Sequence, residues 1–165
     1  MNMPFTPFHF GPALFFGLLL FQYLDLPTFL VSNVILDIEP FLVLYLGLPG
    51  PLHGPFHSYT IGALVALGTA LVMLLAKPVT RPTMSLFQLR QESSPKRIFV
   101  TALLGIYIHV TLDAFLYSEM RLLYPLQFNP LLDMVSSGSV YLFCSLSFLP
   151  GLALYVYRLL RSLRK

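Results

Sequence analysis

Charged residues are scarce in this chain, and their scarcity excludes an ordinary soluble domain. They make up 10% of the 165 residues, whereas 56% are hydrophobic and the mean hydropathy is +0.76. A soluble domain carries about 25% charged residues. We therefore expect an integral membrane protein, and the length predicts a single domain that covers residues 1–165.

Cysteine is almost absent, and the excess of basic residues is small. Cys144 is the only cysteine, which excludes an internal disulfide and a site built from several thiolates. The net charge is +3, but the basic residues form two clusters that flank apolar segments. That arrangement encodes membrane orientation rather than nucleic-acid binding, so we expect no nucleic-acid partner.

Five apolar segments follow one another along the sequence. Spanning a bilayer takes about 20 helical residues, and the first segment is shorter than that. The second contains Asp37, Glu39 and Pro40, and proline breaks the backbone bonding of a helix. We predict an all-α, polytopic membrane helical bundle of about four to five helices, with the second helix broken near Pro40. The segments cover residues 10–24, 27–48, 58–76, 98–117 and 140–160.

The basic residues predict how the chain crosses the membrane. Lys77 is the first of five basic residues between the third and fourth segments, and four more close the chain. The positive-inside rule then places loop 77–97 and the C-terminus in the cytoplasm, in a multi-pass protein of the cell membrane. We expect residues 81–95 to be a solvated connection, and residues 118–137 to lie at the interface or cap the site.

Histidines and acids stand among these apolar segments at spacings typical of metal ligands. His109 and Asp113 are four apart, as are His53 and His57, and residues four apart on a helix share a face. The first 76 residues hold no Lys or Arg to neutralise an acid, and carboxylates in that setting are functional by default. With the basic loops inside, these groups gather in the outer half of the bundle. The predicted ligands are Asp37, His53, His57, His109 and Asp113. His9 and Glu39 are predicted either to bind the metal as well or to orient the residues that do.

This set of ligand types predicts the metal and its number. Mixed histidine and carboxylate ligands suit zinc best among the metals considered, with manganese or iron as alternatives. The set exceeds the three or four ligands of one catalytic zinc, so one or two divalent ions are expected. Glu39 and Arg121 are the predicted catalytic side chains, Arg121 as a ligand for an anionic head group or else as an interfacial anchor. Ser58 is expected to hydrogen-bond a helix start rather than to act as a nucleophile.

The motifs that carry these residues resemble those of the YdjM-like family of predicted membrane-bound metal-dependent hydrolases. The chain has Thr-Pro-Phe-His at 6–9, Leu-Asp-Ile-Glu-Pro at 36–40 and His-Gly-Pro-Phe-His-Ser at 53–58. Ile-His-Val-Thr-Leu-Asp follows at 108–113 and Arg-Leu-Leu-Tyr-Pro at 121–125. The resemblance covers roughly residues 4–130. Glu39 stands where the family has Asp, Ile108 where it has Ser, and Tyr124 where it has Trp.

The resemblance implies a membrane-embedded hydrolase that uses metal-activated water. Its expected substrate is a phosphoester or related ester of a lipid or lipid-linked molecule, and its expected partner is the lipid bilayer. A metal-handling or transport protein with the same ligands is one alternative. A non-catalytic membrane partner protein is another, with a polar network that serves packing only.

Overall fold

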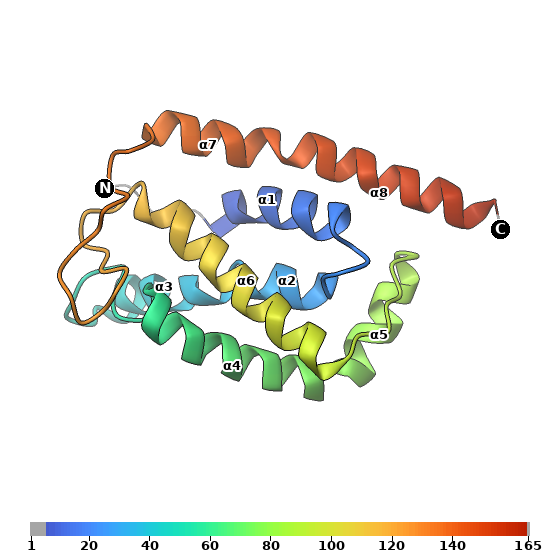
Figure 1. Ribbon diagram of the computed structural model, residues 1–165, viewed down its shortest axis with the longest axis horizontal. Coiled ribbons are helices and arrows are strands. Elements are labelled where there is room, and N and C mark those ends of the chain that lie inside the picture. Colours follow the sequence, from blue (N-terminus) through green and yellow to red (C-terminus); the bar gives the residue numbers. More distant parts are fainter. Residues whose placement is uncertain (1–5, 165) are drawn as a thin grey trace.

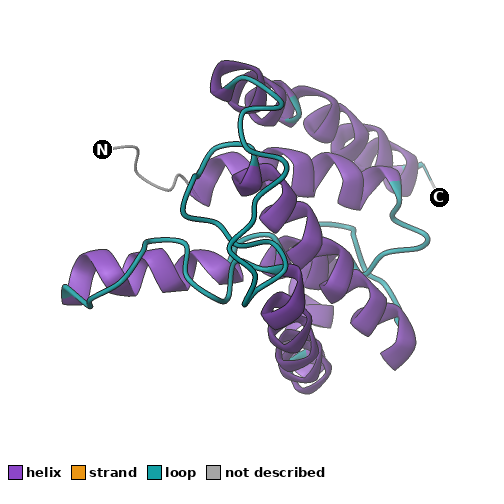
Figure 2. Ribbon diagram, turned by 60° about the vertical axis from the view of Figure 1, so that its left-hand side comes forward, coloured by secondary structure: helices purple, strands orange, loops and turns teal. Residues whose placement is uncertain are grey.

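The computed structural model describes residues 6–164, and this part of the chain is helical with no β-strand. Long loops cover residues 47–58 and 115–136, and they come together at one end of the molecule (Figure 1 and Figure 2). The elements are α1 (Thr6–Leu19), α2 (Leu26–Ser32), the 3-10 helix η1 (Ile35–Asp37), α3 (Ile38–Leu46), α4 (Tyr59–Leu75), α5 (Lys77–Leu86), α6 (Pro95–Ala114), α7 (Ser137–Leu146) and α8 (Phe148–Leu163).

Three helical stretches of the described chain are long and apolar enough to cross a membrane. They are Leu26–Leu46, Pro95–Ala114 and Ser137–Leu163. A fourth candidate joins α4 and α5, which meet at an angle of 74°. α1 is apolar but short, as its segment predicted. The all-helical architecture expected from the sequence is confirmed for the described residues, and the three or four candidate spans compare with the four to five helices that the apolar segments predicted.

Helix α6 lies at the centre of the fold and packs against α4 and α2, while α1 packs against α8 and α7 (Figure 1). The main core joins α4 and α6 through small and branched side chains, among them Ala66, Ala102 and Ile106. Gly105 allows the close approach of α6 to α2, because a Cβ atom there would lie 2.5 Å from the Cβ of Ser32. The centre of α6 is therefore held against two neighbours, and its C-terminal half reaches the two long loops.

Short polar side chains define where several helices begin. Asp25 accepts a hydrogen bond from the backbone N–H of Thr28 at the start of α2, and Ser58 accepts one from Ile61 at the start of α4. Such N-caps satisfy N–H groups that have no partner within the helix. The predicted helix-start role of Ser58 is confirmed, and the cap fixes the direction in which the chain leaves His57.

The second apolar segment is interrupted before Pro40 rather than at it. The irregular backbone covers residues 33–37 between α2 and α3, and it includes η1. Pro40 lies in the first turn of α3, where a missing N–H breaks no intrahelical bond. Asn33 donates its side-chain amide to the carbonyl of Phe29. Because of this interruption, the Asp37 side chain points toward α6.

Residues 81–95 are only partly the solvated connection that we expected. Residues 77–86 form α5, and Leu89 is buried. The Gln91 amide donates to the carbonyls of Phe21 and Leu24 and accepts from the N–H of Leu26. This part of the chain therefore clamps the turn between α1 and α2. The sequence did not predict these Gln91 hydrogen bonds, because a polar loop residue has the same place in the sequence whether it bonds backbone groups or water.

Residues 118–137 fold back over the start of α4 and the end of α6, in line with the predicted cap. The carbonyl of Leu122 accepts from the N–H of Tyr59, and Asn129 donates to the carbonyl of Ala114. Met120 and Leu122 are buried in the main core. The loop thus closes the end of the bundle where α4 begins and α6 ends.

Candidate metal centre

Six buried ionisable side chains from four segments meet beside the C-terminal half of α6. α6 supplies two of them, α1 and η1 supply one each, and the loop before α4 supplies two. None is more than 6% exposed. The six are His9, Asp37, His53, His57, His109 and Asp113.

Asp113 is the carboxylate that all four histidines face. Its Oδ2 lies 3.0 Å from His109 Nε2, 3.9 Å from His57 Nε2 and 4.0 Å from His53 Nε2. Its Oδ1 lies 3.2 Å from His9 Nε2. His109 and Asp113 therefore face each other from one side of α6, as their spacing of four residues predicted.

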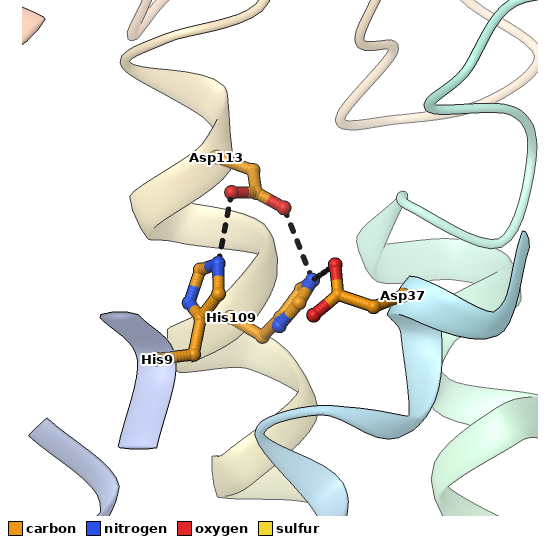
Figure 3. Close-up of side chains that lie close together, drawn as sticks. All are labelled: His9, Asp37, His109 and Asp113. Carbon is orange, nitrogen blue, oxygen red and sulfur yellow. Dashed lines mark ion pairs between the residues drawn. The ribbon is translucent and has the colours of Figure 1, made fainter. Parts of the chain in front are cut away.

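His9 and Asp37 approach His109 from different sides, as Figure 3 shows. The rings of His9 and His109 stack with centroids 4.1 Å apart. On the other side, Asp37 Oδ1 lies 3.8 Å from His109 Nε2. The interruption between α2 and α3 therefore brings the Asp37 carboxylate to α6, although Asp37 lies 76 residues before Asp113 in the sequence.

Each of three histidines is held through Nδ1, which leaves Nε2 directed at the cluster. His57 Nδ1 donates to Glu39 at 2.8 Å, and His53 Nδ1 donates to Glu119 at 3.0 Å. His109 Nδ1 donates to the backbone carbonyl of Asn33 at 2.8 Å. Metal-binding histidines are usually fixed by such a bond to carboxylate or carbonyl, which sets the tautomer. The three side chains are thus oriented as ligands are.

The atoms that face the centre of the cluster lack hydrogen-bond partners. Among residues 6–164, these are Nε2 of His53, His57 and His109, both oxygens of Asp37, and Oδ2 of Asp113. His109 Nε2 is close to Asp113, but their relative angle does not suit a hydrogen bond. Buried polar atoms without partners are rare because each costs free energy. A cation bound among them would satisfy these atoms together.

The six side chains divide into two groups that share Asp113. His9, Asp37, His109 and Asp113 form one, and His53, His57 and Asp113 form the other. Within each group, one ligand atom per residue lies within 4.8 Å of all the others. These buried groups could hold a metal ion, and a carboxylate with two oxygens is able to serve both. Nitrogen and oxygen donors suit zinc, manganese and iron alike, so the donor set does not distinguish these metals.

Two groups at the edge of the cluster have pKa values shifted by burial. The pKa of His57 is lowered mainly by desolvation, which outweighs the hydrogen bond to Glu39. The neutral imidazole that this favours is the form that binds metals. The pKa of Tyr117 is raised, first by desolvation and then by the Asp113 charge. Its ring stacks on His53 with centroids 3.8 Å apart, so a protonated tyrosine covers that histidine.

Two predicted site residues lie outside the two ligand groups. Glu39 bonds the far side of His57, which is where a residue that orients a ligand would lie, one of the two roles predicted for it. Arg121 is exposed on the loop after α6. Among the described residues, no ion pair joins Arg121 to the cluster. Its predicted role as a head-group ligand stays a prediction.

Sequence reasoning missed three groups that support the cluster. Glu119 is one of only seven acids and lies six residues after Asp113, so its type and place were a usable signal. Tyr117 lies one turn beyond Asp113, where an aromatic residue could equally be core. The third group is the Asn33 carbonyl, and a backbone acceptor leaves no signal in the sequence.

The chain matches no protein-family model, no curated protein sequence and no solved structure.

Proposed function

We propose that this protein is a membrane-embedded metal-dependent hydrolase. The observation that carries the proposal is the orientation of three histidines, each bonded through Nδ1 and aimed through Nε2 at Asp113. A polar network that served packing alone would pair those Nε2 atoms, and the described residues leave them unpaired. The YdjM-like motifs add support from the sequence.

Two adjacent ligand groups that share a carboxylate favour hydrolysis over metal storage. When bound, a pair of ions polarises an ester oxygen and lowers the pKa of water, as in many phosphoester-cleaving enzymes. Asp113 would hold both ions, while Glu39 and Glu119 fix the ligand tautomers of His57 and His53. Burial of the cluster excludes bulk water, which strengthens the interaction of these charges with a polar substrate group.

A lipid or lipid-linked ester is the proposed substrate class. A hollow of about 230 Å³ has Glu39 in its wall, and Glu39 accepts the hydrogen bond of His57 in the cluster. The other lining residues are all apolar: Ile35, Leu36, Ile38, Leu42, Phe56 and Val65. Such a wall suits an alkyl chain whose polar end reaches the neighbourhood of His57. Arg121 is the proposed ligand for an anionic head group outside the buried cluster.

The proposed location is the cell membrane, with loop 77–97 and the C-terminus in the cytoplasm. The metal centre then lies toward the outer face. Its ligands gather beside one end of α6, and a transport path would need ligand groups along the bundle. This distribution favours a hydrolase over the transport alternative.

The test combines metal content with hydrolysis by the full-length protein in detergent. We expect stoichiometric bound zinc, manganese or iron, and cleavage of a p-nitrophenyl phosphate diester that carries a long alkyl chain in preference to a methyl analogue. Asp113→Asn preserves shape but removes the shared charge, so metal content should fall more than about tenfold and cleavage with it. Glu92→Gln is the control, because Glu92 is an exposed acid in the loop before α6.

The outcomes separate the alternatives. Metal bound at the wild-type level without any ester cleavage would support the metal-handling alternative. A metal-free protein in which Asp113→Asn lowers the melting temperature would support the non-catalytic partner, because its polar network serves packing. Equal loss of cleavage in Glu92→Gln and Asp113→Asn would argue against a role for the cluster.

A further inference from the structure

A separate cavity lies at the opposite end of α6 from the metal centre. Its volume is about 460 Å³, and it opens where the C-terminal ends of α1 and α8 meet the loop before α6. Cavities that bind small molecules measure about 300–1,000 Å³. None of its lining residues belongs to the His/Asp cluster, so its ligand has no connection with the metal.

Part of the cavity wall is apolar, and the cavity lies at the edge of a candidate membrane span. Leu19 and Leu154 line it, with the ring of Tyr157 beside them. Leu19 is 50% exposed, although it is a large apolar residue. The span Ser137–Leu163 ends at this cavity, where hydrocarbon would give way to lipid head groups. An occupant with an apolar tail fits this position.

Two arginines bring positive charge to the same cavity. Arg158 donates to the carbonyl of Leu18 at 2.9 Å, and its guanidinium lies 4.2 Å from the centre of the Phe21 ring. These contacts fix it against the wall. Arg161 lines the cavity one turn later and is exposed. Within residues 6–164, no carboxylate forms an ion pair with either arginine.

We propose that this cavity binds the phosphate head group of an anionic phospholipid. Guanidinium groups bind phosphate oxygens through paired hydrogen bonds, and two arginines that form no ion pair with the described carboxylates line the cavity. The acyl chains would lie along Leu19 and Leu154. The bound lipid would connect α1 to α8 and to residues 88–89, which stabilises this end of the bundle.

The test measures lipid binding to the full-length protein by native mass spectrometry in detergent. The probes are phosphatidylglycerol, phosphatidylcholine and inorganic phosphate at equal concentrations. Arg161→Gln removes one cavity charge, and because Arg161 is exposed, the fold should persist. Leu19→Trp fills the cavity without a change in charge, and Ser162→Leu is a second filling variant. Arg164→Gln is the matched control, since Arg164 caps the same helix outside the cavity.

We expect the wild type and Arg164→Gln to prefer phosphatidylglycerol to phosphatidylcholine. Arg161→Gln should weaken phosphatidylglycerol binding about fivefold, which is the usual effect of one basic residue near an anionic lipid. At least one filling variant should weaken it as much. Melting temperatures in lipid-free detergent that match the wild type would show that the variants fold.

Three results would overturn the proposal. Equal losses in Arg161→Gln and Arg164→Gln would mean diffuse attraction to surface charge. Full lipid binding by both folded filling variants would mean that the cavity is not the site. Binding of inorganic phosphate as strong as that of phosphatidylglycerol would mean a site for free anions.

Discussion

Asp113 shows how much of this centre depends on single side chains. One oxygen lies 3.2 Å from His9 and the other 3.0 Å from His109, while His53 and His57 lie about 4 Å away. Helical spacing predicted only its pairing with His109. The other three histidines reach it from α1 and from the loop before α4. A residue pattern within one helix predicts a pair, but it does not predict which distant segments complete the site.

The carboxylates behind His57 and His53 permit a comparison at the same scale. Glu39 has a side chain 14% exposed, and that of Glu119 is 33% exposed. A carboxylate that is better shielded from water orients its histidine more strongly. We predict that Glu39→Gln weakens metal affinity about tenfold or more and that Glu119→Gln weakens it less.

A competition titration against a chelator of known affinity measures this difference. Glu92→Gln again serves as the control acid-to-amide change on an exposed side chain. Equal affinities in all three variants would show that these hydrogen bonds do not position the histidines. A greater loss at Glu119 than at Glu39 would reverse the order that burial predicts.

At the scale of elements, the contact between α2 and α6 determines where Asn33 lies. A Cβ atom at Gly105 would meet the Cβ of Ser32 at 2.5 Å and Asn33 Nδ2 at 3.1 Å. The Asn33 carbonyl accepts the hydrogen bond that holds His109. A change in the distance between α2 and α6 would therefore move the carbonyl that orients His109.

Gly105→Ala should separate these helices and destabilise the protein by about 1–3 kcal/mol, the usual cost of excess volume in a packed core. Metal affinity should fall as well, because the Asn33 carbonyl moves away from His109. Thermal unfolding in detergent and metal titration measure the two effects. Gly68→Ala is the matched control on α4, where an added Cβ atom meets nothing within 4 Å. If both variants unfold at the same temperature, the α2–α6 contact is not tight.

At the scale of the whole molecule, the two basic segments lie at the same end. The cavity that contains Arg158 and Arg161 also contains Gln88 and Leu89 from loop 77–97. Figure 1 shows the C-terminal end of α8 on the same side as α5 and the start of α6. The positive-inside rule requires both basic segments on one side of the membrane, and the fold is compatible with that requirement.

Single cysteines introduced into sealed membrane vesicles test the sidedness. Cysteines at Leu86 and Arg164 should react with an impermeant maleimide from the cytoplasmic side, and one at Gln127 from the opposite side. Cys144 is buried and serves as the internal control, because it should not react from either side. Reaction of Leu86→Cys and Gln127→Cys from the same side would contradict the proposed topology.

Composition and spacing by themselves determined that the chain is rich in apolar segments and carries metal-binding side chain types among them. A composition with 10% charged residues is typical of a membrane protein, and histidine and carboxylate side chains within it predict a metal site. Helical periodicity places His109 beside Asp113 because those residues are neighbours on one face. These conclusions follow from local chemistry alone.

Only the tertiary structure decided how the site is completed. The assignment of Glu39 to the far side of His57, and of Asp37 to the side of His109, depends on the irregular residues 33–37. The Asn33 carbonyl and the Gln91 clamp involve backbone groups that every residue carries, so the sequence cannot mark them. The cavity at Arg158 likewise exists because α1, α8 and the loop before α6 meet there, and helix packing brings those distant segments together.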